Sequence, residues 1–334
     1  MKNDMLASVP GILTALAGLL GTEIKNRRLE IPPKFGKGYC RGFVFNRHIR
    51  MLVSNYELKE DIVIKNPQVN IPGRMIFFKF QNIFPATEQS PTEKHPVQTP
   101  SVLIATSRLN TDDFISIHSN TATINIEVDA DYLNEQFDLP GKSPVLQSLL
   151  QNTQPLLFEQ LIYPSLQKIV DDIRTESVSE TFELFYLRIK AEDLVCRLLM
   201  ELETRSETHL YALNNSDVET IYKVKEQILS DLQTPPSINQ LAKYASMSPT
   251  KLKRIFKQVF GNSIFRYYQE FRMKEAVRLL QENRLSVSEV GYELGFTNLS
   301  HFSKVFEEHV GMKPKKYSSS YSSMAHSKKR KKDV

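Results

Sequence analysis

Residues 238–260 read INQLAKYASMSPTKLKRIFKQVF, and residues 287–310 read VSEVGYELGFTNLSHFSKVFEEHV. Both stretches have a short segment with periodic apolar residues, a tight turn, and a longer periodic segment that is followed by glycine. The copies are 49 residues apart before the turn and 50 after it, so the second turn is one residue longer. This duplication predicts two helix-turn-helix units.

The longer segment of each copy has the apolar spacing of a helix with one buried face. Ser248 suits the N-cap of the first long helix, and Pro249 suits its first position, where a missing N–H costs nothing. Gly261 and Gly311 suit the left-handed residue that ends each helix. The residues of the predicted buried faces are Leu252, Ile255, Phe256, Val259 and Phe260, then Phe302, Val305, Phe306 and Val310.

Polar and cationic side chains remain for the outer faces of both long helices. Arg and Lys donate to guanine edges and phosphates, Ser and Asn bond to either, and leucine can contact a thymine methyl. A solvated surface is the usual role of such a face, but two matching cationic copies favour DNA binding. The candidate residues are Thr250, Lys251, Lys253, Arg254 and Lys257 in the first unit, and Asn298, Leu299, Ser300, His301, Ser303 and Lys304 in the second.

The charge of the chain is divided unevenly along its length. Residues 216–334 carry 21 Lys and Arg against 12 Asp and Glu, whereas residues 1–215 carry 22 against 26. The net charge of +5 therefore combines a basic C-terminal part with an acidic N-terminal part. A basic domain binds polyphosphate with a strong dependence on salt. The basic run at 328–332 is interpreted as part of a disordered tail, 321–334, that adds non-specific DNA affinity.

A dense, ordered set of residues between positions 217 and 318 carries a family resemblance. The segment resembles the DNA-binding domain of the AraC/XylS family of bacterial transcription regulators. This resemblance implies seven helices, with a middle helix from about Ser263 to Asn283. The residues that carry it are Leu241-Ala242, Ser248-Pro249, Leu252 to Lys257, Phe260-Gly261, Arg272-Met273, Ala276, Leu279-Leu280, Val287, Val290-Gly291, Leu294 to Phe296, His301 to Phe306, Gly311, Pro314 and Tyr317.

The resemblance also implies a role for each outer-face residue. Bases would be contacted by Thr250, Lys253 and Arg254 in the first unit, and by Ser300, His301 and Lys304 in the second. Phosphate contacts position a protein without reading sequence, and they would come from Lys251, Lys257 and Ser303. Asn298-Leu299 departs from the family, which often has serine or glutamine there. A middle helix of some twenty residues spans about 30 Å, close to the ~34 Å between successive major-groove faces.

The N-terminal two-thirds predict a separate domain, so the fold class is α+β. Short runs rich in β-branched and aromatic residues between about 29 and 128 predict a small antiparallel barrel or sandwich. Residues 144–152, 155–175 and 179–204 predict helices, and a polar break at 214–216 separates them from the DNA-binding domain, 216–320. The predicted strand segments are 42–45, 49–53, 61–64, 75–80, 102–105 and 123–128.

In the regulator family, an N-terminal cupin-like barrel often binds a small effector, and nearby helices often form a dimer. The resemblance thus implies that residues 1–215 sense an effector and form a homodimer. Core packing is the commoner role of the barrel aromatics and of an apolar helix stripe, and solvated surface is that of single cations. The candidate ligand residues are Phe45 and four cations that suit an anionic ligand, Arg47, Arg50, Arg74 and Lys79. The helix stripe is Phe182, Phe185, Ile189, Leu194, Leu198, Met200 and Leu202.

Residues 247–257 and 267–270 resemble the siderophore-responsive, pyochelin-regulator-like branch of the family. That branch controls iron-uptake genes, so the resemblance implies a siderophore as effector. The family further implies an activator whose partners are promoter DNA and RNA polymerase.

The sequence gives less support to two other classes of function. A cupin-type enzyme has little support, because the histidines show no metal-ligand spacing and no glycine-rich phosphate loop or G-x-S-x-G is present. No metal, cofactor or catalytic residue is therefore expected. A ligand-independent architectural protein would not need 215 residues beside its DNA-binding domain.

Cys40 and Cys196 are predicted to be buried free thiols. The apolar residues 5–20 are too few to span a bilayer and predict a short helix packed on the sensor domain, which suits a cytoplasmic protein.

Overall fold

The computed structural model describes residues 9–60, 62–63, 74–83, 99–107, 109, 116–117, 120–137, 143–282 and 285–320. The chain divides into two compact units, residues 1–217 and 218–334. The basic run at 328–332 lies outside the described residues, as do the first eight residues.

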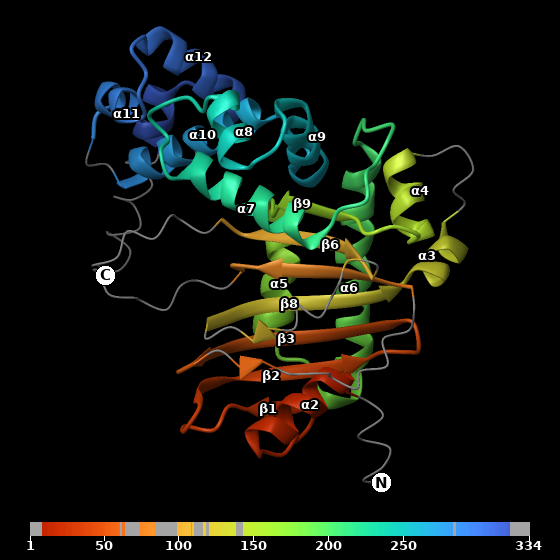
Figure 1. Ribbon diagram of the computed structural model, residues 1–334. Coiled ribbons are helices and arrows are strands. Elements are labelled where there is room, and N and C mark those ends of the chain that lie inside the picture. The colour runs from red at the N-terminus through yellow and green to blue at the C-terminus, as the bar shows by residue number, and fades with distance from the viewer. Residues whose placement is uncertain are drawn as a thin grey trace, which may run out of the picture. The chain divides into compact units, whose positions relative to one another are not determined.

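Unit 1 contains a seven-stranded antiparallel sheet, visible edge to edge in Figure 1. The strand order is β1-β2-β3-β8-β5-β6-β9, and each neighbouring pair is antiparallel. A separate two-stranded ladder joins β4 (Ile62–Val63) and β7 (Ser116–Ile117). The sheet strands are β1 (Arg28–Glu30), β2 (Gly36–Val44), β3 (Ile49–Leu58), β5 (Met75–Gln81), β6 (Ser101–Thr106), β8 (Asn120–Asp129) and β9 (Leu157–Leu161).

This architecture confirms the α+β class and the antiparallel sheet. The sequence predicted a small antiparallel barrel or sandwich. Among the described strands, β1 and β9 are the two ends of the order and do not pair with each other, so these strands form an open sheet. Strand β9 was predicted as helix. Its apolar run pairs with β6, with Phe158 opposite Ile104, and the helix begins only at Pro164. A short apolar run fits either structure, and here strand pairing decides.

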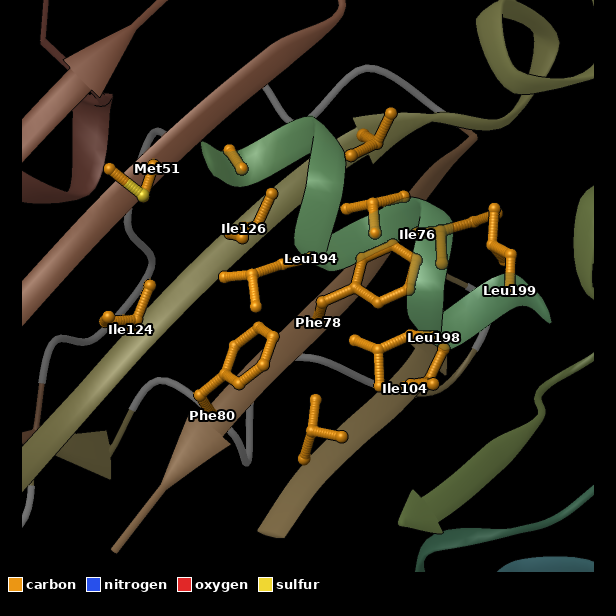
Figure 2. Packing of buried hydrophobic residues seen from close by; sticks show 14 of the residues in the cluster. Met51, Ile76, Phe78, Phe80, Ile104, Ile124, Ile126, Leu194, Leu198 and Leu199 are labelled. Atoms are coloured by element: carbon orange, nitrogen blue, oxygen red, sulfur yellow. The ribbon is translucent and has the colours of Figure 1, made fainter. Parts of the chain in front are cut away.

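Helices cover one face of the sheet. They are α3 (Ala130–Gln136), which was not predicted, α4 (Pro144–Gln151), α5 (Pro164–Thr175) and α6 (Glu180–Glu203). In Figure 2, Leu194 and Leu198 of α6 lie against Phe78 and Ile104 of the sheet. In β3, β5, β6 and β8, alternate residues belong to this core, as the period of two requires. The core therefore holds α6 rigidly on the sheet.

The predicted stripe on α6 divides into two opposite faces. Leu194, Leu198 and Leu202 are buried in the core. Phe182, Phe185, Ile189 and Met200 are exposed, with exposed fractions of 64%, 67%, 47% and 62%. The sequence did not distinguish these two faces. A 24-residue helix with apolar residues on both sides has no single periodic stripe.

Helix α2 (Gly11–Leu20) forms a second, smaller core with β1, β2 and β3, as expected for the apolar N-terminal segment. Cys40 lies in this core, and burial raises the pKa of its thiol to about 12. Cys196 was also predicted to be buried, but it is exposed on α6. Both thiols are free.

Unit 2 is helical. Helix α7 (Asn215–Leu229) crosses the boundary between the units, and α10 (Ile264–Glu282) confirms the predicted middle helix. The first helix-turn-helix unit is α8 (Ile238–Tyr244) with α9 (Pro249–Phe260), and the second is α11 (Val287–Glu293) with α12 (Leu299–Val310). A further helical segment at 314–320 completes seven helices among the described residues of this unit.

Both turns begin with a residue in the left-handed region, Ser246 in the first unit and Gly295 in the second. At each turn, backbone N–H groups bond back to the preceding helix, as in Met247 N to Ala242 O and Phe296 N to Gly291 O. Gly295 is more constrained, because a Cβ atom there would overlap the carbonyl oxygen of Gln233. The second turn therefore requires glycine, whereas the first accepts serine.

Replacing Gly295 by alanine should destabilise the protein by about 1–3 kcal/mol, because it adds left-handed backbone strain to a clash with Gln233. Ser246→Ala is the matched control, since the Cβ is already present there and its effect should be smaller. Urea unfolding followed by circular dichroism measures both, and equal midpoints for the two variants would contradict the role of the close approach.

Candidate DNA-binding site

The N-terminus of each long helix is fixed by a side-chain cap. Ser248 accepts a hydrogen bond from the backbone N–H of Lys251, and Pro249 occupies the first position. Asn298 accepts from the N–H groups of Ser300 and His301. Each cap satisfies amides that the helix leaves unpaired and sets the angle at which the long helix starts. The caps therefore position the first turns of α9 and α12, where the candidate base contacts lie.

The predicted outer faces are indeed mostly exposed. The residues that project from α9 and α12 share one face on each helix, opposite the buried apolar residues. Lys251, Leu299 and Ser303 are half-buried. The exposed candidates are Thr250, Lys253, Arg254, Lys257, Asn298, Ser300, His301 and Lys304.

Two candidates of the second unit have local structural roles. The side-chain oxygen of Asn298 is engaged as the N-cap of α12. The Leu299 side chain packs against α11, since a Cβ placed on Gly291 would lie 2.7 Å from Leu299 Cδ2. These contacts explain both residues without DNA. The glycine at 291 is the sequence signal for the close packing.

The two long helices align with a shift of 50 residues, so Ser300 corresponds to Thr250 and Lys304 to Arg254. In the same alignment His301 corresponds to Lys251, and Ser303 to Lys253. His301 therefore does not occupy the position of a predicted base contact of the first helix-turn-helix unit. The His301 ring lies 5.7 Å from the Phe296 ring. The two outer faces are therefore similar in shape but not equivalent in residues.

The two long helices also differ in charge. Helix α9 carries three Lys and one Arg and no acidic residue, whereas α12 carries only Lys304 with Glu307 and Glu308, leaving histidines aside. Glu307 stands at the position of Lys257. Because phosphate neutralisation dominates affinity for DNA, α9 supplies more of it than α12.

Helix α10 connects the two helix-turn-helix units. Tyr267, in its N-terminal half, has its ring 5.3 Å from Phe256 and 5.2 Å from Phe260 of α9. Met273, Ala276 and Leu280 pack with α11 and α12 in the core of the second helix-turn-helix unit. Its 19 residues span about 28 Å, comparable with the ~34 Å spacing of groove faces on one side of B-DNA.

The buried guanidinium of Arg272 connects the second helix-turn-helix unit to α10. Arg272 is 5% exposed and donates from Nε to the carbonyl of Leu294 at 3.1 Å and from Nη1 to Gln269 Oε1 at 3.0 Å. Its Nη2 also donates to Leu294, and its charge lies 3.8 Å from the centroid of the Phe296 ring. Burial lowers the pKa of Arg272. This side chain thus binds both the end of α11 and the turn that follows.

The candidate ligand residues in unit 1 are only partly brought together. Arg50 and Lys79 lie on the sheet face opposite the main core, because Arg50 pairs in register with Glu127, and Lys79 with Asn125, two residues along β8. Arg50 Nε lies 2.7 Å from Glu127 Oε2. Burial lowers the pKa of Lys79 and raises that of Glu127, which Arg50 opposes.

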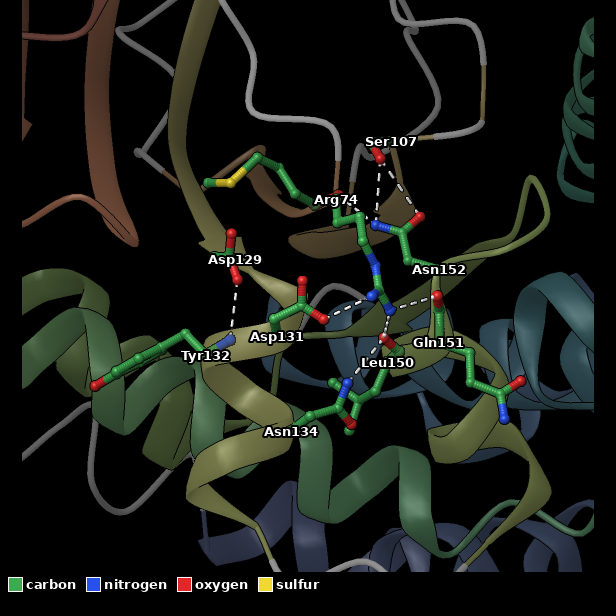
Figure 3. Close-up of polar contacts among 10 residues, drawn as sticks. Arg74, Ser107, Asp129, Asp131, Tyr132, Asn134, Leu150, Gln151 and Asn152 are labelled. Atoms are coloured by element: carbon green, nitrogen blue, oxygen red, sulfur yellow. Dashed lines mark hydrogen bonds and ion pairs between the residues drawn. The ribbon is translucent and has the colours of Figure 1, made fainter.

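The other three ligand candidates have structural contacts instead. Phe45 packs against the main core, and Arg47 donates to the ring of His48 at 2.8 Å. Arg74 Nη1 forms an ion pair with Asp131 Oδ1 at 2.6 Å, and its Nη2 donates to the carbonyl of Gln151 at 2.8 Å (Figure 3). That carbonyl lies in the last turn of α4, where cations are favourable. Arg74 therefore stabilises the junction of β5, α3 and α4, and its role in ligand binding stays a prediction.

Two capped, exposed helices on one connecting helix define a DNA-binding domain of the helix-turn-helix class. Comparison with known proteins agrees, since residues 241–320 match the family model of the helix-turn-helix domain. The C-terminal unit is an AraC-type helix-turn-helix domain.

Three relatives illustrate the similarity. Regulatory protein PchR of Pseudomonas aeruginosa is 42% identical over 72 residues, which cover 22% of this chain and 24% of that protein. The transcriptional regulator GbdR of the same species is 30% identical over 139 residues, covering 42% and 35%. The transcriptional activator RhaR of Escherichia coli is 30% identical over 127 residues, covering 38% and 45%. The chain thus spans less than half the length of each relative.

Metal-ligand clusters and membrane-spanning helices are not found within the described residues. Among them, no group of three or more His, Cys, Asp or Glu residues is arranged to hold a metal ion. None of the helices within the described ranges is both long and apolar enough to cross a membrane.

Arg254→Ala should weaken specific DNA binding by about 1–3 kcal/mol, the usual contribution of a bidentate contact to a base. Lys257→Ala should weaken binding to all sequences and reduce the salt slope by about 0.9, as expected for one phosphate contact. Fluorescence anisotropy with specific and scrambled duplexes separates the two effects. If Arg254→Ala weakens both duplexes equally, Arg254 is a phosphate contact and not a base contact.

Proposed function

We propose that the chain is a ligand-responsive transcription activator that binds promoter DNA with α9 and α12 in two adjacent major-groove segments. The observation that carries this proposal is the pair of capped, exposed helices at the two ends of α10. The basic charge of residues 216–334 supports it, because long-range attraction to polyphosphate raises both association rate and affinity. The similar protein RhaR is named a transcriptional activator, which favours activation of transcription over repression.

In this proposal residues 1–215 sense the effector and form a dimer, residues 216–320 bind DNA, and residues 321–334 form a basic tail. The protein works in the cytoplasm, where it acts on RNA polymerase at promoters, and it is not an enzyme. These roles follow the family resemblance of the C-terminal domain, and the size of the N-terminal unit supports a sensing function.

The effector we propose is an anionic small molecule, a siderophore by the resemblance of residues 247–257 and 267–270. Its binding residues would be Arg50 and Lys79. Supporting this, Arg50 Nη2 is buried and has no hydrogen-bond partner among the residues that the structure describes. A buried guanidinium nitrogen without a partner is costly, so an anionic ligand group would satisfy it.

The proposed dimer uses the exposed face of α6. Phe182, Phe185, Ile189 and Met200 lie on one side of the helix, opposite the face that packs on the sheet. Phe182, Phe185 and Ile189 follow one another at helical spacing, with Met200 further along the same side, and exposed apolar side chains of this size mark association surfaces. A second copy of the chain that packs its own α6 here would bury both stripes.

Selection of bound fragments from a random DNA library by the full chain tests the DNA-binding function. We expect an asymmetric site with two different elements about 10–11 base pairs apart, because the two outer faces differ. We also expect affinity to fall steeply with salt, with about −0.9 in slope for each phosphate contact. Recovery of no sequence preference, or of affinity insensitive to salt, would overturn the proposal.

The dimer has its own test. Phe185→Asp places a charge in the exposed stripe and should convert the dimer to monomers in sedimentation velocity. Phe265→Asp is the matched control, because Phe265 is also an exposed phenylalanine, 56% exposed, but lies on α10. A wild-type protein that sediments as a monomer at high concentration, or a Phe185→Asp variant that remains dimeric, would show that this face does not mediate association.

A further inference from the structure

A cavity of about 220 Å³ lies in unit 1, on the sheet face opposite to the one that carries the Arg50 and Lys79 side chains. It is bounded by the start of β3, the end of β8, helix α3 with the residue that follows it, and the middle of α6. The ten lining residues are Ile49, Val128, Tyr132, Leu133, Gln136, Phe137, Ala191, Glu192, Val195 and Cys196.

The walls of this cavity are apolar and held in place. Ile49, Val128 and Ala191 are buried side chains that belong to the main core. Tyr132 is fixed on one side by His48, whose ring stacks on it at 4.9 Å with an interplanar angle of 15°. The backbone N–H of Tyr132 is bonded to Asp129, the N-cap of α3. A rigid apolar wall favours a ligand that brings apolar surface out of water.

One charged group faces this wall. Among the described residues that line the cavity, Glu192 is the one acidic or basic side chain. Its Oε1 accepts from Arg188 Nε at 3.0 Å and from the Tyr132 hydroxyl at 3.5 Å. Both contacts fall on Oε1, so within the described part of the chain Oε2 keeps its capacity to accept a further donor.

The size of the cavity limits the ligand. Pockets for drug-sized ligands measure about 300–1,000 Å³, so about 220 Å³ suits a molecule with one ring and a short chain. We propose that this cavity binds a small single-ring aromatic amine, with the ring against the apolar wall and the ammonium group on the Glu192 carboxylate. Four lining residues belong to α6, the helix that carries the exposed apolar stripe, so an occupied cavity acts on the helix of the proposed dimer.

This proposal rests on the proposed function only in treating the amine as a second effector, distinct from the anionic effector proposed at Arg50 and Lys79. Its binding is therefore measured without DNA, so that failure here leaves the DNA-binding proposal unaffected. The probe is tyramine, and its neutral and anionic analogues, 2-(4-hydroxyphenyl)ethanol and 4-hydroxyphenylacetate, test the charge. Isothermal titration calorimetry on the full chain should rank tyramine first and 4-hydroxyphenylacetate last.

Glu192→Gln keeps the shape of the side chain and removes its charge. We expect it to weaken tyramine binding about tenfold or more, the range for a hydrogen bond to a charged group. Asp193→Asn is the matched control, since Asp193 forms the equivalent pair with Arg197 four residues on but does not line the cavity. Circular dichroism confirms that both variants fold.

Alkylation of Cys196 places the ligand in the cavity. Cys196 is an exposed thiol that lines it, whereas Cys40 is buried with its pKa raised to about 12 and serves as the unreactive reference within the same chain. At one fixed protein concentration, saturating tyramine should slow iodoacetamide labelling of Cys196 at least about fivefold, since a bound ligand blocks access. Binding that Glu192→Gln does not weaken, labelling that tyramine does not slow, or no heat of binding with millimolar tyramine would each overturn the proposal.

Discussion

The C-terminal domain depends on the buried guanidinium of Arg272. Its donors bind the carbonyl of Leu294 and the side chain of Gln269, and its charged plane lies over the ring of Phe296. Loss of this side chain would remove the donors that Arg272 supplies to the Leu294 carbonyl and its cation–π contact with the Phe296 ring. Because Leu294 ends α11 and Phe296 lies in the second turn, one residue of α10 sets the position of the whole second helix-turn-helix unit. Lysine would not replace it, since a point charge lacks the planar fork.

This constraint explains why two unequal helix-turn-helix units form one domain. The first helix-turn-helix unit packs on the N-terminal half of α10 through aromatic rings. The second packs on Arg272 and on the C-terminal half of α10, through a core of aliphatic and phenylalanine side chains. The first long helix is strongly cationic, whereas the second combines one lysine with serines and acidic residues. The arrangement suits a protein whose first unit provides most of the phosphate attraction and whose second unit adds hydrogen bonds to an asymmetric site.

Much of this domain was predictable, because its helices are marked locally by Ser248, Pro249, Gly261 and Gly311 and by strong apolar periodicity. The roles of Asn298 and Leu299 were not, since capping and packing on Gly291 depend on how α11 and α12 meet. In unit 1 the strand segments were predictable from alternation, but the open order of the sheet and strand β9 depend on long-range pairing. For the same reason the sequence gives no sign that Arg74 binds the end of α4, 77 residues further along the chain. The cavity beside Glu192 has no local signal, because its lining comes from four separate elements.

The central claim is that α10, through Arg272, holds two non-equivalent units on one face of DNA. A hydroxyl-radical footprint of the Arg272→Met variant on a selected binding site tests it most directly, with circular dichroism to confirm that the helices remain. The account predicts that protection of the half-site bound by α9 persists while protection of the half-site bound by α12 is lost. Wild-type protection of both half-sites at the same protein concentration would contradict it.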